Sequence, residues 1–202
     1  MLPDIVLLDI FDFYMAHASD RPIYDREMWI TLVHVCRKWR EIVFESPRRL
    51  NLRLLFTLRK SVRKMLDTWP PLLIDIVFGV GIWILAALEH GDRIRQIELY
   101  GPSRLDMERA LAAMRKPFPE LIYLSLNLFD GEPMFIRPII RDSFLGGSAP
   151  RLQSLELNGI SFSLPALKKL LCLPPTLSKF VFGEFRIPGT FHPKKWSLAF
   201  PL

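Results

Sequence analysis

Residues 152–160, Leu-Gln-Ser-Leu-Glu-Leu-Asn-Gly-Ile, carry the pattern that decides the fold of this 202-residue chain. Leucines stand at positions 152, 155 and 157, and the same spacing occurs in Ile94-x-x-Ile97-x-Leu99 and Leu121-x-x-Leu124-x-Leu126. Weaker copies are Leu177-x-x-Phe180-x-Phe182 and Pro71-x-x-Ile74-x-Ile76. Alternation of apolar and other residues is the period of a β-strand. We therefore expect five strands, one in each copy.

The copies recur at a nearly constant interval. They begin at residues 71, 94, 121, 152 and 177, which are 23, 27, 31 and 25 residues apart. Helix-like stretches lie between them at 105–114 and 164–173. Leucine-rich repeats have a period of roughly 20–29 residues, and each repeat buries its apolar face against its neighbours. We expect an α/β fold with a short, irregular leucine-rich-repeat solenoid over 71–187. An ordinary α/β domain with parallel strands is the alternative, because it shows similar alternation.

The strand face of such a solenoid is exposed to a binding partner. We expect a target protein to bind there, or the residues simply to face solvent. The candidate side chains are Arg95, Gln96, Glu98, Tyr100, Tyr123, Ser125, Asn127, Gln153, Ser154, Glu156 and Asn158.

The first 50 residues predict a separate helical module. Pro3 and Asp4 suit the first turn of a helix, which needs no proline N–H and favours negative charge. Val6, Leu7, Ile10, Phe11 and Tyr14 then follow at helical spacing. After a polar loop over 15–28, a second helix is expected from about Glu27 to Glu45, with Trp29, Leu32, Val33, Cys36, Trp39 and Val43 as its apolar set. Ser46-Pro47 ends it.

Some apolar residues of this module lie outside the stripes that are expected to form its core. Leu8, Val35 and Ile42 fall off the main apolar stripes, and a helical module of under 50 residues buries little surface of its own. The surplus apolar surface indicates either a partner or packing on the domain that follows.

The same residues resemble a known family. Leu2-Pro3, Leu7-Leu8-x-Ile10-Phe11 and Val35-Cys36-Arg37-Lys38-Trp39-Arg40 match the F-box pattern in order and spacing, and residues 2–50 as a whole resemble the F-box-like domains abundant in mushroom-forming fungi. That resemblance implies docking onto the Skp adaptor of SCF ubiquitin ligases. Carried over by position, the docking or docking-support residues are Leu2, Pro3, Leu7, Ile10, Leu32, Val35 and Trp39. Ile5 departs from the acidic residue that the family often has there, and the loop over 15–28 is longer than in a minimal F-box.

Charge is unevenly distributed along the chain. Residues 37–64 contain ten Lys and Arg against two Glu, a net charge of +8, whereas the whole chain carries +6. This stripe could steer an acidic partner or form a solvated helix face. Binding of nucleic acid is not expected, because few aromatic residues are interleaved with the basic ones.

The apolar segment 72–88, LLIDIVFGVGIWILAAL, allows two interpretations. Its composition suggests a membrane anchor, but it is short for a span and contains Asp75. Gly79 and Gly81 divide it into a strand-like half and a helix-like half, which predicts a buried strand, a turn and a buried helix. We expect the second interpretation to hold.

Nothing in the sequence indicates catalysis. His17, His34, His90 and His192 are scattered, Cys36 and Cys172 lie far apart, and no phosphate-binding loop, nucleophile elbow or metal-ligand spacing occurs. We expect no enzyme, no cofactor and no metal. The cysteine usage and the lack of a signal peptide at the start suit a reducing compartment, the cytoplasm or the nucleus.

Together these features predict a target-binding adaptor of an SCF-type cullin ubiquitin ligase. The expected organisation is the helical module at 2–50, a basic linker at 51–70, repeats at 71–187 and an irregular tail at 188–202. The alternatives are a repeat scaffold outside any ligase and a membrane-associated protein anchored by 72–88.

Overall fold

A computed structural model describes residues 2–16, 27–57, 61–77, 83–128, 137–163, 166, 176–185 and 194–199. The chain divides into two compact units. The first comprises residues 1–55 and 65–73, and the second comprises residues 56–64 and 74–202. Each unit is considered by itself below.

The first unit is mainly helical. It contains α1 (Asp4–Ala16), α2 (Trp29–Val35) and α3 (Arg37–Glu45). β1 (Arg53–Phe56) and α4 (Val62–Thr68) contribute residues to both units. The prediction of a first helix after Pro3 is confirmed, and the segment 51–70, expected to be a linker, contains β1 and α4. Most of the predicted 15–28 loop lies outside the described residues.

The prediction of one helix from Glu27 to Glu45 is wrong, because the chain breaks at Cys36. The backbone of Cys36 is extended, with φ −159° and ψ 170°, so α2 and α3 are separate helices. The guanidinium of Arg40 donates to the carbonyl of Val33 over 3.0 Å and satisfies one of the acceptors at the end of α2. After the break, Cys36 is exposed and Ile42 is buried in the core. The apolar spacing predicted the opposite, with Cys36 in the apolar set and Ile42 outside it. The end of α3 at Ser46 agrees with the prediction.

An aromatic cluster forms the centre of the first unit. Trp29 is fully buried, and its ring meets those of Trp69 and Phe44 edge-on at centroid distances of 5.0 and 6.1 Å. The indole nitrogen of Trp29 donates to the carbonyl of Arg53 over 2.9 Å. The backbone N–H of Leu55 donates to the carboxylate of Glu27 over 3.0 Å. These two bonds hold β1 against the start of α2.

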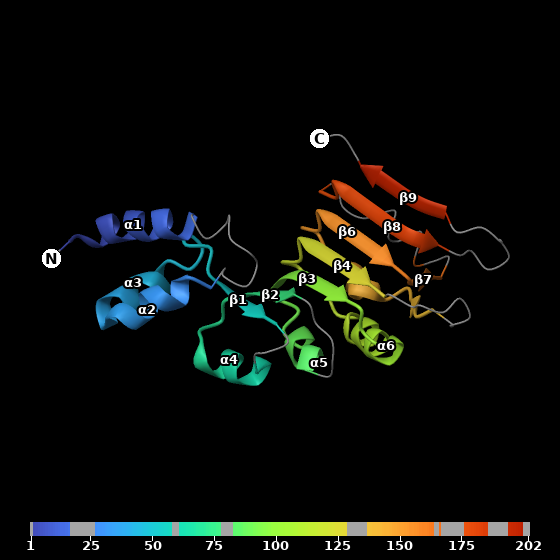
Figure 1. Cartoon of the computed structure of the whole chain (residues 1–202), viewed down its shortest axis with the longest axis horizontal. Coiled ribbons are helices and arrows are strands. Elements are labelled where there is room, and N and C mark those ends of the chain that lie inside the picture. Colours follow the sequence, from blue (N-terminus) through green and yellow to red (C-terminus); the bar gives the residue numbers. More distant parts are fainter. Residues whose placement is uncertain are drawn as a thin grey trace. The chain divides into compact units, whose positions relative to one another are not determined.

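The second unit is a mixed α/β structure built on a parallel sheet (Figure 1). Its elements are β2 (Leu73–Val77), α5 (Trp83–Leu88), β3 (Ile94–Tyr100), α6 (Arg104–Ala113), β4 (Tyr123–Asn127), β6 (Ser154–Asn158), β8 (Lys179–Phe185) and β9 (Lys194–Ala199). The strand order is β1-β2-β3-β4-β6-β8-β9. Strands β2, β3, β4, β6 and β8 are parallel, and β9 is antiparallel to β8. A smaller parallel pair joins β5 (Ile139–Ile140) to β7 (Ser161–Phe162), and a 3-10 turn, η2, spans Phe144–Gly147.

All five predicted strands are present, and each neighbours the next. The second residue of one copy hydrogen-bonds to the second residue of the copy before it: Ile122 N–H to Arg95 C=O, Gln153 N–H to Ile122 C=O, and Ser178 N–H to Gln153 C=O, over 2.8–2.9 Å. The predicted helix at 105–114 is confirmed as α6, whereas almost all of 164–173 lies outside the described residues. β9 lies within 188–202, expected to be irregular.

The apolar side chains of these strands form the core of the second unit. Ile97, Leu99, Leu124, Leu126, Leu155 and Leu157 are all buried, as are Met107, Ala110 and Leu111 of α6. Figure 1 shows α5 and α6 on the same side of the sheet. Parallel strands need such crossover connections, and in this fold they leave the polar side chains on the other face of the sheet.

The segment 72–88 contains β2 and α5, as the strand, turn and helix interpretation expects; residues 78–82 are outside the described part. Among the residues that the structure describes, no helix is both long and apolar enough to cross a membrane.

Candidate binding surfaces

The polar face of the sheet forms three rows across the parallel strands. The pairing register aligns Gln96 with Tyr123, Ser154 and Lys179 in the first row. Glu98, Ser125 and Glu156 make up the second row, and Tyr100, Asn127 and Asn158 the third. The structure therefore brings together nine of the eleven candidate side chains: Gln96, Glu98, Tyr100, Tyr123, Ser125, Asn127, Ser154, Glu156 and Asn158.

Arg95 and Gln153 do not belong to these rows. Each stands one residue before the paired positions that make up the first row, and Arg95 is half-buried whereas Gln153 is exposed. Their backbone carbonyls accept the hydrogen bonds that link successive copies. The sequence pattern selected Arg95 and Gln153 because each follows an apolar residue. That criterion does not separate the row positions from the residues next to them.

Hydrogen bonds between side chains connect residues within a row and residues of neighbouring rows. Asn158 donates to Asn127, and Asn127 donates to the Ser125 hydroxyl over 2.8 Å. Gln96 donates to Glu98, and Lys179 pairs with Glu156 over 2.5 Å. Glu98, Ser125 and Asn127 are buried, and buried polar groups in proteins are normally satisfied in this way. These three residues therefore stabilise the face, and the half-buried Tyr100, Tyr123, Glu156 and Asn158 are left at its surface.

Tyr123 occupies an environment that keeps its phenol neutral. Burial raises the pKa of Tyr123 above its ordinary value, and the nearby carboxylates Glu156 and Glu98 raise this pKa further, against a lowering effect from its hydrogen bond with Ser125. The phenol can therefore donate a hydrogen bond to a ligand but cannot act as an anion near neutral pH.

A second candidate surface is the exposed apolar face of α1. Leu7 and Phe11 point into the core of the first unit, and the Phe11 ring meets that of Trp39 at a centroid distance of 4.8 Å. Other apolar side chains of the helix are exposed, beside the exposed carboxylate of Asp9. These apolar side chains, with the exposed fraction of each, are Ile5 (58%), Val6 (37%), Ile10 (46%) and Phe13 (69%), with Leu2 (53%) just ahead of the helix.

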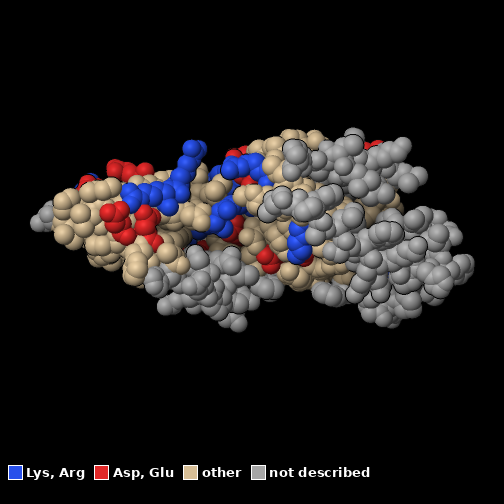
Figure 2. All heavy atoms as spheres, turned by 90° about the horizontal axis from the view of Figure 1, so that it is seen from above, with Lys and Arg blue, Asp and Glu red and all other residues tan. Residues whose placement is uncertain are grey.

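Ion pairs also connect α1 to the rest of the first unit. Arg49 pairs with Asp9 over 2.6 Å and with Asp12 over 2.7 Å, and Lys38 pairs with Asp4 over 2.5 Å. The hydrogen bonds that Arg49 donates to Asp12 and Asp9 raise the pKa of Arg49, which stays charged. Part of the basic stripe at 37–64 is thus balanced by acidic residues of α1. Figure 2 shows acidic and basic side chains next to one another on this part of the surface.

The predicted docking residues divide into two groups. Leu2, Pro3, Ile10 and Val35 are exposed and could contact a partner directly. Leu7 and Leu32 are buried and Trp39 is half-buried, so these three support the unit from within. Ile5, Val6 and Phe13 were missed as surface residues. Their helical spacing from Ile10 could have revealed them, but Val6 was assigned to the inner face.

In the described part of the chain, no group of three or more His, Cys, Asp or Glu side chains could hold a metal ion. No protein-family model, curated protein or solved structure matches the chain.

Proposed function

We propose that this protein is the substrate-recognition adaptor of an SCF-type cullin ubiquitin ligase. In this proposal the first unit is an F-box-like module that docks onto the Skp-type adaptor. The strands and helices of the second unit are an irregular leucine-rich-repeat array that binds a protein target. The family resemblance of residues 2–50 and the five regularly spaced parallel strands support both parts.

The exposed apolar face of α1 is the observation that carries the proposal. A short helix in a small unit gains stability by burying one apolar side, and α1 already does so through Leu7 and Phe11. Ile5 and Ile10 leave 58% and 46% of their surface exposed. Several exposed apolar side chains on one helix are typical of an interaction site, and a helix laid against a partner's apolar groove is a common way to cover them.

The sheet offers the chemistry of a recognition surface. Tyr100, Tyr123 and Asn158 combine aromatic area with hydrogen-bonding groups, and the buried network beneath them holds the face rigid. Aromatic side chains are enriched where proteins bind one another. Glu98 is buried and Glu156 is paired with Lys179, so this face offers mainly hydrogen-bonding groups, and a target segment with hydrogen-bonding side chains fits best.

The mechanism of such an adaptor is proximity and not catalysis. Holding a target close to a ubiquitin-loaded enzyme raises the effective concentration of the reacting groups without catalytic residues in this chain. On this proposal the protein is no enzyme, needs no cofactor, and works in the cytoplasm or nucleus.

Co-purification with a Skp-type adaptor tests the proposal. We expect the full chain to capture the purified adaptor, and the double variant Ile10→Asp/Phe13→Asp to lose at least about tenfold in affinity, because two charges would be buried without partners. The matched control is Leu105→Asp on α6, an equally exposed apolar residue of the other unit. The proposal fails if the wild-type chain does not bind the adaptor or if Leu105→Asp weakens binding as much as the double variant does.

The rival function is an interaction scaffold that works outside any ligase. The polar face of the sheet favours it equally, because that face needs no adaptor to bind a target. A target captured by the full chain and by Ile10→Asp/Phe13→Asp alike, with no adaptor bound to either, would favour the scaffold.

A further inference from the structure

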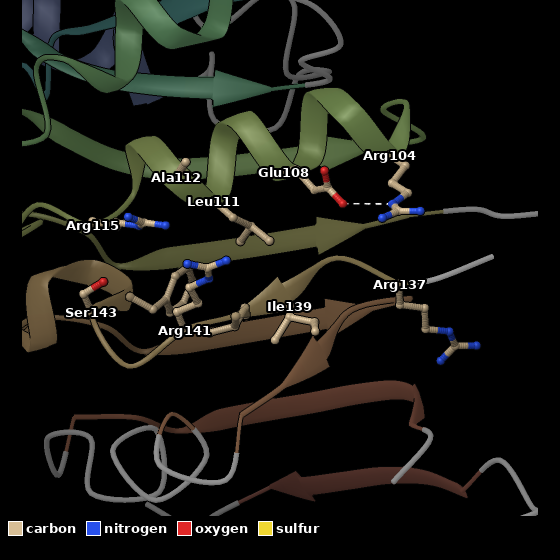
Figure 3. A pocket seen from close by; sticks show the side chains of 11 residues that line it. Arg104, Glu108, Leu111, Ala112, Arg115, Arg137, Ile139, Arg141 and Ser143 are labelled. Atoms are coloured by element: carbon tan, nitrogen blue, oxygen red, sulfur yellow. Dashed lines mark hydrogen bonds and ion pairs between the residues drawn. The ribbon is translucent and has the colours of Figure 1, made fainter. Parts of the chain in front are cut away.

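A cavity in the second unit has a lining that neither binding surface described above includes. It has a volume of about 310 Å³ and lies between α6 and the segment that contains β5 and η2 (Figure 3). Arginines 104, 115, 137 and 141 line it together with one acidic residue, Glu108. The lining therefore carries a net charge of +3.

Two of these arginines have charge to offer to a ligand. Arg104 pairs with Glu108 on the same helix over 2.8 Å. The guanidinium groups of Arg115 and Arg141 have no hydrogen-bond or ion-pair partner within the described residues. Figure 3 shows the Arg141 guanidinium beneath Leu111 and Arg115 extending toward the same space, whereas Arg137 extends away from it. A guanidinium binds phosphate or carboxylate oxygens through two parallel N–H donors.

Apart from Ser143, the remaining lining residues are apolar. Leu111, Ile140 and Phe144 are buried, and Ile139 is 54% exposed at the cavity. An inorganic anion would use only the arginines and leave these side chains uncovered. Six of the eleven lining residues are charged or polar and five are apolar, so the lining suits a ligand that has both an anionic and an apolar part. The volume of about 310 Å³ lies at the lower end of the range for small-molecule sites.

We propose that this cavity binds a small organic phosphate monoester, with its phosphate on Arg115 and Arg141 and its apolar part against Leu111, Ile139 and Phe144. The charge of the lining favours phosphate over carboxylate, because a phosphate monoester carries about −1.5 to −2 near pH 7 and a carboxylate only −1. This inference does not depend on the proposed ligase function.

Calorimetric titration of the full chain tests the assignment with four probes. They are hexyl phosphate, inorganic phosphate, hexanoate and hexanol. We expect hexyl phosphate to bind at a single site and more tightly than the other three, because it alone presents both the dianion and the apolar part. The assignment is overturned if hexyl phosphate gives no saturable binding, if hexanoate binds as tightly, or if hexanol does.

Three variants locate the site. Arg115→Gln/Arg141→Gln should weaken hexyl phosphate binding by about tenfold or more, since it removes both unpaired guanidinium groups. Arg109→Gln is the matched control, because Arg109 lies on α6, pairs with Asp106 and does not line the cavity. Ile139→Asn should reduce the preference for hexyl phosphate over inorganic phosphate. Equal loss in Arg109→Gln, or unchanged binding in Arg115→Gln/Arg141→Gln, would exclude this cavity as the site.

Discussion

Individual residues of α1 show that one short helix can bury apolar side chains in the core and expose others at the surface. Phe11 and Ile10 are neighbours in sequence, yet Phe11 is fully buried and Ile10 is 46% exposed. A helix rotates by about 100° per residue, so apolar residues on adjacent positions cannot share one face. The apolar spacing alone therefore could not tell which set faces the core. In the folded chain Leu7 and Phe11 are buried and Phe11 packs on Trp39, while Asp9 and Asp12 pair with Arg49.

Trp29 has a greater structural role than the half-buried Trp39, and substitution should show it. We expect Trp29→Phe to lower the free energy of unfolding by about 1–3 kcal/mol, because it leaves the buried carbonyl of Arg53 without its indole donor. Trp39→Phe is the control, since its indole makes no hydrogen bond within the described residues, and should cost less than about 1 kcal/mol. Urea denaturation followed by circular dichroism measures both, and a larger loss in Trp39→Phe would contradict the prediction.

Tyr123 should make the protein sensitive to alkaline pH. Its pKa is raised in the folded chain by burial and by Glu156, whereas an unfolded tyrosine titrates near pH 10. Above about pH 10 the unfolded state therefore binds fewer protons than the folded state, and stability falls as the pH rises. We expect Tyr123→Phe to lose less stability than the wild type between about pH 9 and 11. Denaturation curves at several pH values test this, and parallel losses in both proteins would refute it.

At the scale of elements, the regular parts were predictable and the breaks were not. The five strands followed from apolar positions two residues apart, such as Leu155 and Leu157, because one buried face imposes that period. The break at Cys36 was not predictable, since the apolar spacing from Trp29 continues through it and no Gly or Pro marks it. β1 was missed because its burial pattern lacks alternation, and all three residues Leu54, Leu55 and Phe56 are buried.

Turns after the strands also repeat. Gly101 N–H donates to Asn127 C=O over 2.9 Å, and Leu128 N–H donates to Asn158 C=O over 3.0 Å, so each strand end is tied to the next. Gly159 stands at this position after β6 with φ +72°, and a Cβ there would overlap the carbonyl oxygen of Leu128. Such a position tolerates only glycine, because both the backbone angle and the space exclude a side chain.

Substitution of this glycine tests the packing of the strand ends. We expect Gly159→Ala to cost about 1–3 kcal/mol more than Gly147→Ala, since it adds a clash with the Leu128 backbone. Gly147 is a close match, with φ +71° and nothing within 4 Å of the place that a Cβ would occupy, so its substitution costs only the strain of the angle, about 1–2 kcal/mol. Thermal and urea denaturation compare the two variants. Equal losses would mean that the close approach of Leu128 has no energetic consequence.

At the scale of the whole molecule, the two units use different chemistry for their candidate partners. The first unit offers the apolar face of α1, and the second offers a polar sheet face and a cavity lined by Arg115 and Arg141. The sequence predicted the strands and the residues of the polar face well, because both follow from the local period. The cavity escaped prediction because its residues come from two segments about 30 positions apart, and only the fold brings them together.

This difference in chemistry leads to opposite expectations for salt. Screening shortens the Debye length from about 10 Å at 0.1 M to about 3 Å at 1 M, which weakens contacts between exposed charges, whereas apolar burial is little affected. Raising NaCl from about 50 to 500 mM should therefore weaken hexyl phosphate binding several-fold and change adaptor affinity less than about twofold. Titrations of the same preparation at each salt concentration measure both affinities. A steep salt dependence of adaptor binding would show that the 37–64 basic stripe, and not the α1 apolar face, dominates the contact with the adaptor. In that case the Ile10→Asp/Phe13→Asp variant would retain most of its affinity for the adaptor at low salt.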